Sequence, residues 1–145
     1  MTLGTFLDFS KAFDTIDHSI LLRKLYKYGI RGVANDLVKS YLKKRKQYVS
    51  FDKISSESLP INCGVPQGSI LGPLFLILYV NDIYLVSNSF MPILFTDDSS
   101  VFVQGKNINS MTTDLNNSLD LIYQWTIVNR LSLNIDKTYC MLFKK

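Results

Sequence analysis

Residues 93–103 read ILFTDDSSVFV, two short apolar segments around a polar centre that holds two adjacent carboxylates. Segments rich in β-forming residues on either side of a short polar stretch predict a β-hairpin with Asp97 and Asp98 at its tip. Thr2 to Leu7 also alternates and is rich in β-formers, which predicts a strand with Asp8 at its C-terminal end. If these strands are neighbours in one sheet, the three carboxylates converge.

A carboxylate cluster of this kind favours a bound cation, because two ionised carboxylates about 5 Å apart repel by roughly 3 kcal/mol at an effective dielectric constant of about 20. No His or Cys lies near these acids in the sequence, and oxygen-only ligands favour Mg²⁺ or Mn²⁺ over zinc. A pair of such ions can hold both the attacking and the leaving oxygen of an in-line phosphoryl transfer. The acids therefore predict metal-dependent phosphoryl chemistry.

Each of these motifs is weak when taken singly. A lone Asp-Asp-Ser is more often a turn than a metal site, and a lone Asp at a strand end is commonly a cap. Asp14 is a weaker ligand candidate than Asp8, because it can serve local turn chemistry. His18, the only histidine, begins a predicted helix beside a cap, which favours a surface or partly packed role over catalysis. The functional prediction depends on the combination of acids.

Apolar periodicity and capping residues predict the remaining elements. Asp17 is a predicted N-cap for a helix over 18–28, and Gly29 is its predicted stop. A second helix is expected over 31–46, with an apolar stripe of Val33, Leu37, Val38 and Tyr41. Further expected elements are strands over 47–51 and 59–63, a loop over 64–69, a helix buried on several sides over 74–86, a long amphipathic helix over 107–128, and strands over 131–135 and 139–143. Hairpins mixed with helices predict an α+β fold with a largely antiparallel sheet.

The composition fits a single compact domain over residues 1–145. With 47% hydrophobic and 19% charged residues and no repeat, the chain does not match disordered or solenoid proteins. The longest apolar run, 70–80, is too short to cross a bilayer, and the N-terminus lacks the features of a secretory signal. Cys63 and Cys140 lack metal-ligand spacing, which favours reduced thiols and an intracellular location, in the nucleus or the cytoplasm.

Charge is distributed unevenly along the chain. Residues 23–53 contain ten of the sixteen Lys and Arg residues against two Asp, a net charge of +8, while the remainder carries −4. A basic surface together with an acidic cluster suits a protein that binds a polyanion and performs metal chemistry on it. A solvated helix face explains the basic residues about equally well on charge alone.

Four segments carry a resemblance to a known family. They read FLDFSKAFDTIDH at 6–18, GVPQGSILGP at 64–73, FTDD at 95–98 and LSLNIDKT at 131–138. Together and in this order they closely resemble the palm motifs of reverse transcriptases, in the variant of non-LTR retrotransposons of the jockey-like kind. The resemblance covers almost the whole chain and implies a right-hand polymerase palm, an antiparallel sheet flanked by helices.

The resemblance also implies an activity and its ligands. A palm of this kind uses two Mg²⁺ (or Mn²⁺) ions and deoxynucleoside triphosphates to extend a DNA primer on an RNA template. Asp8, Asp97 and Asp98 match the family's catalytic, metal-binding aspartates. The uneven charge, and not the resemblance, makes the basic run Lys43, Lys44, Arg45 and Lys46 the expected nucleic-acid-binding segment.

Other positions match the family's nucleotide-binding residues. The backbone of Phe9 is expected near the triphosphate, and Phe13 matches the aromatic residue that blocks a ribose 2′-hydroxyl. Gln67, with Gly68, matches the loop near the incoming nucleotide and the template base. Lys137 matches a motif that faces the nucleotide phosphates, where an ammonium can protonate the pyrophosphate leaving group.

Two departures from the family pattern leave alternatives open. Thr96 stands where this group usually has Ala before the acidic pair, and its branched side chain can crowd the primer terminus. The fingers, thumb and endonuclease expected around a palm are absent from the 145 residues, which suggests a truncated mobile-element copy. A non-catalytic nucleic-acid-binding remnant and an unrelated Mg²⁺-dependent phosphotransferase are the competing hypotheses.

Overall fold

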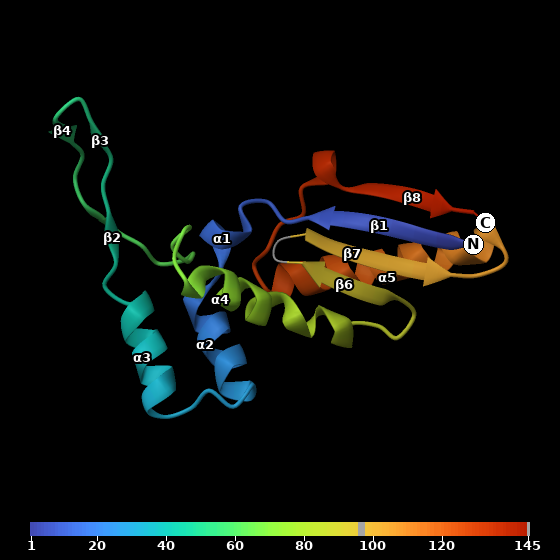
Figure 1. The fold of residues 1–145 in the computed structure, drawn as a ribbon, viewed down its shortest axis with the longest axis horizontal. Helices are drawn as coiled ribbons and strands as arrows, with labels where there is room; N and C mark the ends of the chain where they lie inside the picture. Colours follow the sequence, from blue (N-terminus) through green and yellow to red (C-terminus); the bar gives the residue numbers. More distant parts are fainter. Residues whose placement is uncertain (96–97, 145) are drawn as a thin grey trace.

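The computed structural model describes residues 1–95 and 98–144 (Figure 1). Its centre is a four-stranded sheet in the order β6-β7-β1-β8, formed by Met91–Phe95, Asp98–Gln104, Thr2–Asp8 and Tyr139–Phe143. Every pair of neighbouring strands is antiparallel. The expected α+β class, the N-terminal strand ending at Asp8 and the C-terminal strand are confirmed.

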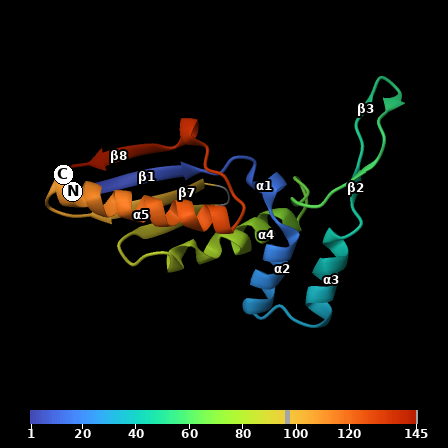
Figure 2. The same cartoon turned by 180° about the vertical axis from the view of Figure 1, so that it is seen from behind.

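One long helix covers one face of this sheet (Figure 2). Helix α5 runs over Ile108–Val128, and the Asn107 side chain caps its start by accepting from the Asn109 amide at 2.9 Å. The buried side chains between helix and sheet are Leu3, Leu7, Val101 and Val103 from the strands and Met111, Leu115 and Ile122 from the helix. Their burial stabilises the sheet, since a fully buried aliphatic side chain contributes about 1.5–3 kcal/mol.

A helical group packs at the end of the sheet where β1 finishes. It comprises α1 (Ala12–Thr15), α2 (His18–Lys27), α4 (Leu71–Val80) and the 3₁₀ helix η1 (Asn81–Leu85). Asp17 caps α2 as expected, because its carboxylate accepts from the Ser19 and Ile20 amides at 2.8 and 3.0 Å. The single helix expected over 74–86 begins earlier, at Leu71, and becomes 3₁₀ after Val80.

A thin extension projects away from the sheet (Figure 1). Helix α3 covers Val33–Leu42, followed by four two-residue strands: β2 (Lys46–Gln47) pairs with β5 (Leu59–Pro60), and β3 (Ser50–Phe51) pairs with β4 (Ile54–Ser55). The five-residue strands expected here were therefore too long. The predicted helix over 31–46 was also too long, because Lys43 is extended and Lys44 has φ +58°. In its predicted apolar stripe, Val33 and Leu37 are 87% and 70% exposed.

The strand expected over 131–135 is wrong. A single bridge joins Leu133 to Phe9, and the chain then turns into the 3₁₀ helix η2 (Ile135–Lys137). Arg130, with φ +54°, redirects the chain as it leaves α5. No helix among the described residues is long and apolar enough to cross a membrane.

Candidate active site

The pairing of β1 with β7 brings two acidic positions together. In the antiparallel register, Asp8, the last residue of β1, stands opposite Asp98, the first residue of β7. Residues paired in this way have Cα atoms about 4.5–5.5 Å apart. The predicted convergence of the strands is therefore confirmed for these two backbone positions. Thr96 and Asp97 lie outside the described residues.

A pocket of about 720 Å³ opens beside Asp8. It collects residues from three distant parts of the chain: the segment after β1, the loop before α4 and the turn before β8. Its lining is Asp8, Phe9, Ser10, Lys11, Ala12, Phe13, Gln67, Gly68, Ser69, Pro73, Asn134 and Lys137. Asp8 and Lys137 also line an adjoining pocket of about 540 Å³ on the side of β7. Six residues predicted for the site thus share one cavity.

The two phenylalanines of the pocket differ in what they expose. The Phe9 side chain is buried, with its ring 6.3 Å from that of Trp125, so the pocket meets the Phe9 backbone. Phe13 is half-buried, packs against the core and still reaches the pocket wall. These positions suit a backbone contact for Phe9 and a side-chain contact for Phe13.

Lys11 is a pocket residue that the sequence reasoning missed. Its backbone lies in the left-handed region, with φ +50° and ψ +43°, a conformation that a residue with a side chain adopts at a cost of about 1–3 kcal/mol. Its carbonyl accepts from the Asp14 and Thr15 amides at 2.9 and 3.2 Å. The available signal was a lysine three residues after a strand-end carboxylate, at a strand-to-helix turn.

The loop 64–69 is docked tightly against the segment that follows Asp8. Gly64 has φ +82°, and a Cβ there would lie 2.7 Å from the Asp14 carbonyl oxygen. The Gly64 amide donates to Ile16, the Val65 amide donates to Phe13, and the Gly64 carbonyl accepts from His18 Nε2, all at 2.7 Å. His18 is thus partly packed, as expected.

Asp14 contacts the loop through its side chain. Its carboxylate accepts from Gln67 Nε2 at 3.3 Å. The Asp14 backbone lies against Gly64 as well. Asp14 therefore orients a predicted site residue and does not line the pocket beside Asp8.

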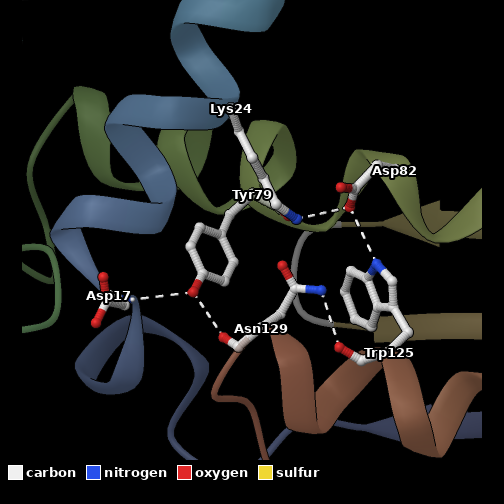
Figure 3. Close-up of polar contacts among 6 residues, drawn as sticks. All are labelled: Asp17, Lys24, Tyr79, Asp82, Trp125 and Asn129. Atoms are coloured by element: carbon white, nitrogen blue, oxygen red, sulfur yellow. Dashed lines mark hydrogen bonds and ion pairs between the residues drawn. The ribbon is translucent and has the colours of Figure 1, made fainter.

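A polar network centred on the buried Tyr79 joins the helices around the site (Figure 3). The Tyr79 hydroxyl donates to the Asn129 carbonyl at 2.6 Å and accepts from the Asp17 amide at 3.4 Å. Lys24 Nζ donates to the Tyr79 carbonyl at 2.5 Å and to Asp82 at 2.6 Å. The network therefore ties α2, α4 and η1 to the C-terminal end of α5.

Two further contacts complete the network. The Asp82 carboxylate also accepts from Trp125 Nε1 at 3.2 Å, and Arg130 pairs with Asp17 at 2.6 Å. Both contacts start from residues in or just after the last turns of α5. They hold the point from which the chain leaves the helix toward the pocket.

Burial is the largest single influence on the pKa values of three residues in this network. Burial raises the pKa of Tyr79 to about 12. Burial lowers the pKa of Lys24, although Asp82 opposes the shift. Burial also acts against the Asp17 carboxylate, but hydrogen bonds from Ser19 and Ile20 and the Arg130 charge leave its pKa below the ordinary value. Tyr79 therefore stays a neutral hydrogen-bond donor over the physiological pH range.

The segment after α5 connects the polar network to the pocket through backbone hydrogen bonds. The Asn134 amide donates to the Asp8 carbonyl, and the Ser10 amide donates to the Ser132 carbonyl, both at 2.8 Å. The Lys137 amide then donates to the Asn134 carbonyl at 3.2 Å. The backbone of Asp8 and the position of Lys137 therefore depend on one segment.

The basic run lies apart from the pocket beside Asp8. Lys43, Lys44 and Lys46 are exposed, Arg45 is half-buried, and none of the four lines that pocket. The structure therefore separates the predicted nucleic-acid-binding segment from the predicted catalytic residues. In the described part of the chain, no group of three His, Cys, Asp or Glu residues is placed to hold a metal ion.

The sequence pattern of the family described as reverse transcriptase (RNA-dependent DNA polymerase) matches residues 1–144. The chain belongs to this family. Membership excludes the hypothesis of an unrelated phosphotransferase, because the match extends over residues 1–144 and not only over the acidic cluster. It also confirms the resemblance that the four motifs indicated.

Relatives of this reverse transcriptase chain come from mobile elements. It is 32% identical over 142 residues to the RNA-directed DNA polymerase from mobile element jockey of Drosophila melanogaster, and the match covers 93% of this chain and 15% of that protein. It is 31% identical over 139 residues to the jockey polymerase of Drosophila funebris, covering 91% of this chain and 15% of that protein. The chain therefore spans about a seventh of the length of these relatives.

Solved structures confirm the fold. The apo telomerase from Candida tropicalis, truncated from its C-terminal domain, aligns with a TM-score of 0.72 at 12% identity. The alignment covers 97% of this chain and 30% of that one. The expected polymerase palm architecture is thus confirmed.

Proposed function

We propose that residues 1–145 form the palm part of an RNA-directed DNA polymerase, which extends a DNA primer on an RNA template with deoxynucleoside triphosphates. The observation that carries the proposal is the register of β1 and β7, which sets Asp8 opposite Asp98 beside a pocket that also contains Gln67 and Lys137. The jockey relatives are described as RNA-directed DNA polymerases, which supports the same activity here.

Asp8, Asp97 and Asp98 are the proposed ligands of two Mg²⁺ (or Mn²⁺) ions. The residues fit such ions, because Asp8 at the end of β1 is paired with Asp98 at the start of the neighbouring strand β7. Carboxylate oxygens are the ligands that these ions prefer. Bound ions would stabilise the negative charge that develops on the primer 3′-oxygen and the charge of the triphosphate.

The other pocket residues hold the nucleotide. In this proposal the Phe9 backbone and the Lys11 ammonium contact the triphosphate, and Phe13 excludes a 2′-hydroxyl; the supporting observation is that all three residues line the pocket beside Asp8. Gln67, oriented by Asp14, and Gly68 border the position of the base.

Lys137 is the proposed general acid of the transfer. The primer 3′-hydroxyl gives its proton to solvent water, its oxygen forms a bond to the α-phosphorus, and the bond from that phosphorus to the bridging oxygen breaks. Lys137 Nζ, which borders the same pocket as Asp8, gives its proton to the departing pyrophosphate oxygen.

Nucleic-acid binding is proposed for Lys43, Lys44, Arg45 and Lys46. Three of these side chains are exposed, and the four residues run from the end of α3 to the first residue of β2. Cations in such a position can neutralise backbone phosphates without reading sequence.

Primer extension tests the proposed function. The chain is placed between the fingers and thumb of a related jockey polymerase, and Asp8→Asn, Asp98→Asn and Lys137→Ala are compared with Asp120→Asn. Asp120 lies exposed on α5 and serves as a matched carboxylate control. Removing a charge that stabilises the transition state costs about 10²–10³-fold in kcat. Equal rates for Asp8→Asn and Asp120→Asn would reject the assignment.

A further inference from the structure

A second large pocket adjoins the proposed nucleotide pocket on the side of the extension. It has a volume of about 820 Å³, within the range of ligand-binding pockets, and shares Lys11 and Gln67 with the pocket beside Asp8. Its other walls come from Asp14 in α1, from Arg45 and Gln47 on either side of the first residue of β2, and from residues 60–66 at and after the end of β5. Because Lys11 and Gln67 belong to both pockets, a polynucleotide strand can pass from one to the next.

Arg45 is the only member of the basic run that lines this second pocket. It is half-buried, whereas Lys43, Lys44 and Lys46 are exposed. Its guanidinium lies 5.4 Å from the centroid of the Tyr41 ring, and its carbonyl accepts from the Ile61 amide at 2.9 Å. The contact with the Tyr41 ring and the hydrogen bond beside the β2–β5 pair therefore fix the side chain and the backbone of Arg45.

The chemistry of the lining suits one unpaired nucleotide. Within the described part of the chain the ion pairs are Lys24–Asp82 and Arg130–Asp17, so Arg45 and Lys11 form none there. The acid of this pocket, Asp14, already accepts from Gln67. The amides of Gln47 and Asn62 can bond to base edges, and the apolar surfaces that can contact a base belong to Pro60, Ile61 and Pro66.

We propose that this second pocket, the Arg45 pocket, holds the unpaired template nucleotide next to the one that pairs with the incoming dNTP. The Arg45 guanidinium, a planar fork that matches phosphate oxygens, binds the phosphate of that nucleotide. The exposed Lys43, Lys44 and Lys46 do not line the pocket, and they can contact backbone phosphates of the paired region, which both a blunt and an extended duplex contain. The inference rests on the proposed polymerase function and gives Arg45 a role that its basic neighbours do not share.

Fluorescence anisotropy with two duplexes tests the proposal. One is a blunt RNA·DNA duplex, and the other carries three extra unpaired nucleotides at the 5′ end of its RNA strand. We expect the chain to bind the extended duplex more tightly. Arg45→Ala should lose roughly tenfold in affinity for the extended duplex, the scale of one charge-assisted phosphate contact, with little change for the blunt one. Lys44→Ala, the matched control, should weaken both duplexes by one common factor.

The outcomes separate this inference from the function on which it rests. Equal weakening of both duplexes by Arg45→Ala, or no weakening, overturns the Arg45 pocket and leaves nucleic-acid binding intact. Failure of the unaltered chain to bind either duplex contradicts the proposed function itself. Arg45→Lys keeps the charge without the fork, so it should recover only part of the preference for the extended duplex. Circular dichroism of each variant confirms that the fold is retained.

Discussion

Tyr79→Phe should destabilise the fold by about 2 kcal/mol, although it removes a single oxygen. Tyr79 is 0% exposed, and its hydroxyl donates to the Asn129 carbonyl at 2.6 Å. The phenylalanine variant leaves that carbonyl without its donor in a place that water does not reach, which costs about 1–3 kcal/mol. The contact from the Asp17 amide is long, at 3.4 Å, and should add little.

Urea denaturation measures this loss as a lower midpoint with an unchanged slope. For a chain of this size, 2 kcal/mol corresponds to a melting temperature lower by about 4–8 °C. Tyr139→Phe is the matched control, because Tyr139 is 57% exposed on β8 and such a surface change should stay within about 0.5 kcal/mol. A Tyr79→Phe variant as stable as the control would refute the view that this hydroxyl holds the end of α5.

The remaining predictions concern pH, sugar selection and salt. Because Tyr79 has a folded-state pKa raised to about 12, the unfolded phenol loses its proton first, so its contribution is complete below pH 10 and is lost as pH rises from 10 to 12. Denaturation across this window should therefore narrow the difference between the unaltered chain and Tyr79→Phe by up to about 1.4 kcal/mol per pH unit, and a constant difference would contradict the shift. In the polymerase completed with related fingers and thumb, Phe13→Val should raise ribonucleotide use relative to deoxynucleotide by about two orders of magnitude, for a loss of roughly 3 kcal/mol. An unchanged ratio of the two kcat/KM values would make Phe13 a core residue only. If Lys43, Lys44, Arg45 and Lys46 each neutralise one phosphate, affinity for the duplex with the unpaired 5′ extension should fall with a log–log salt slope of roughly −3 to −4, and alanine at all four should abolish most of that slope. Unchanged affinity in that variant would leave the run as a solubility feature.

Local patterns in the sequence were enough to predict the parts of the site that depend on strands and caps. The alternation in residues 2–7 predicts β1, and the apolar segments around the acidic pair predict β6 and β7. Asp17 follows the ordinary preference for a side-chain acceptor at a helix start. Each of these signals lies within a few residues of the structure that it specifies.

Contacts between distant segments could not be predicted in this way. The hydrogen bond from Tyr79 to Asn129 joins residues 50 positions apart, and a tyrosine in an apolar helix gives no sign of its acceptor. Residues 131–135 alternate like a strand, yet Leu133 alone pairs, with Phe9, because β1 has already ended at Asp8. Val33 and Leu37 have helical spacing, but spacing does not show whether another element covers them.

The end of β1 at Asp8 is the feature that makes a pocket possible. Asp8 is held from two sides, by its register with Asp98 in β7 and by the Asn134 amide on its carbonyl. Two residues beyond Phe9, the left-handed backbone of Lys11 prevents the strand from continuing and turns the chain into α1. That turn places Phe13 and the Lys11 ammonium on the same cavity as Asp8, where a continuing strand would have carried them past the edge of the sheet. The strained backbone of Lys11 therefore lies where the strand must change to a helix, so that Asp8, Lys11 and Phe13 line one pocket.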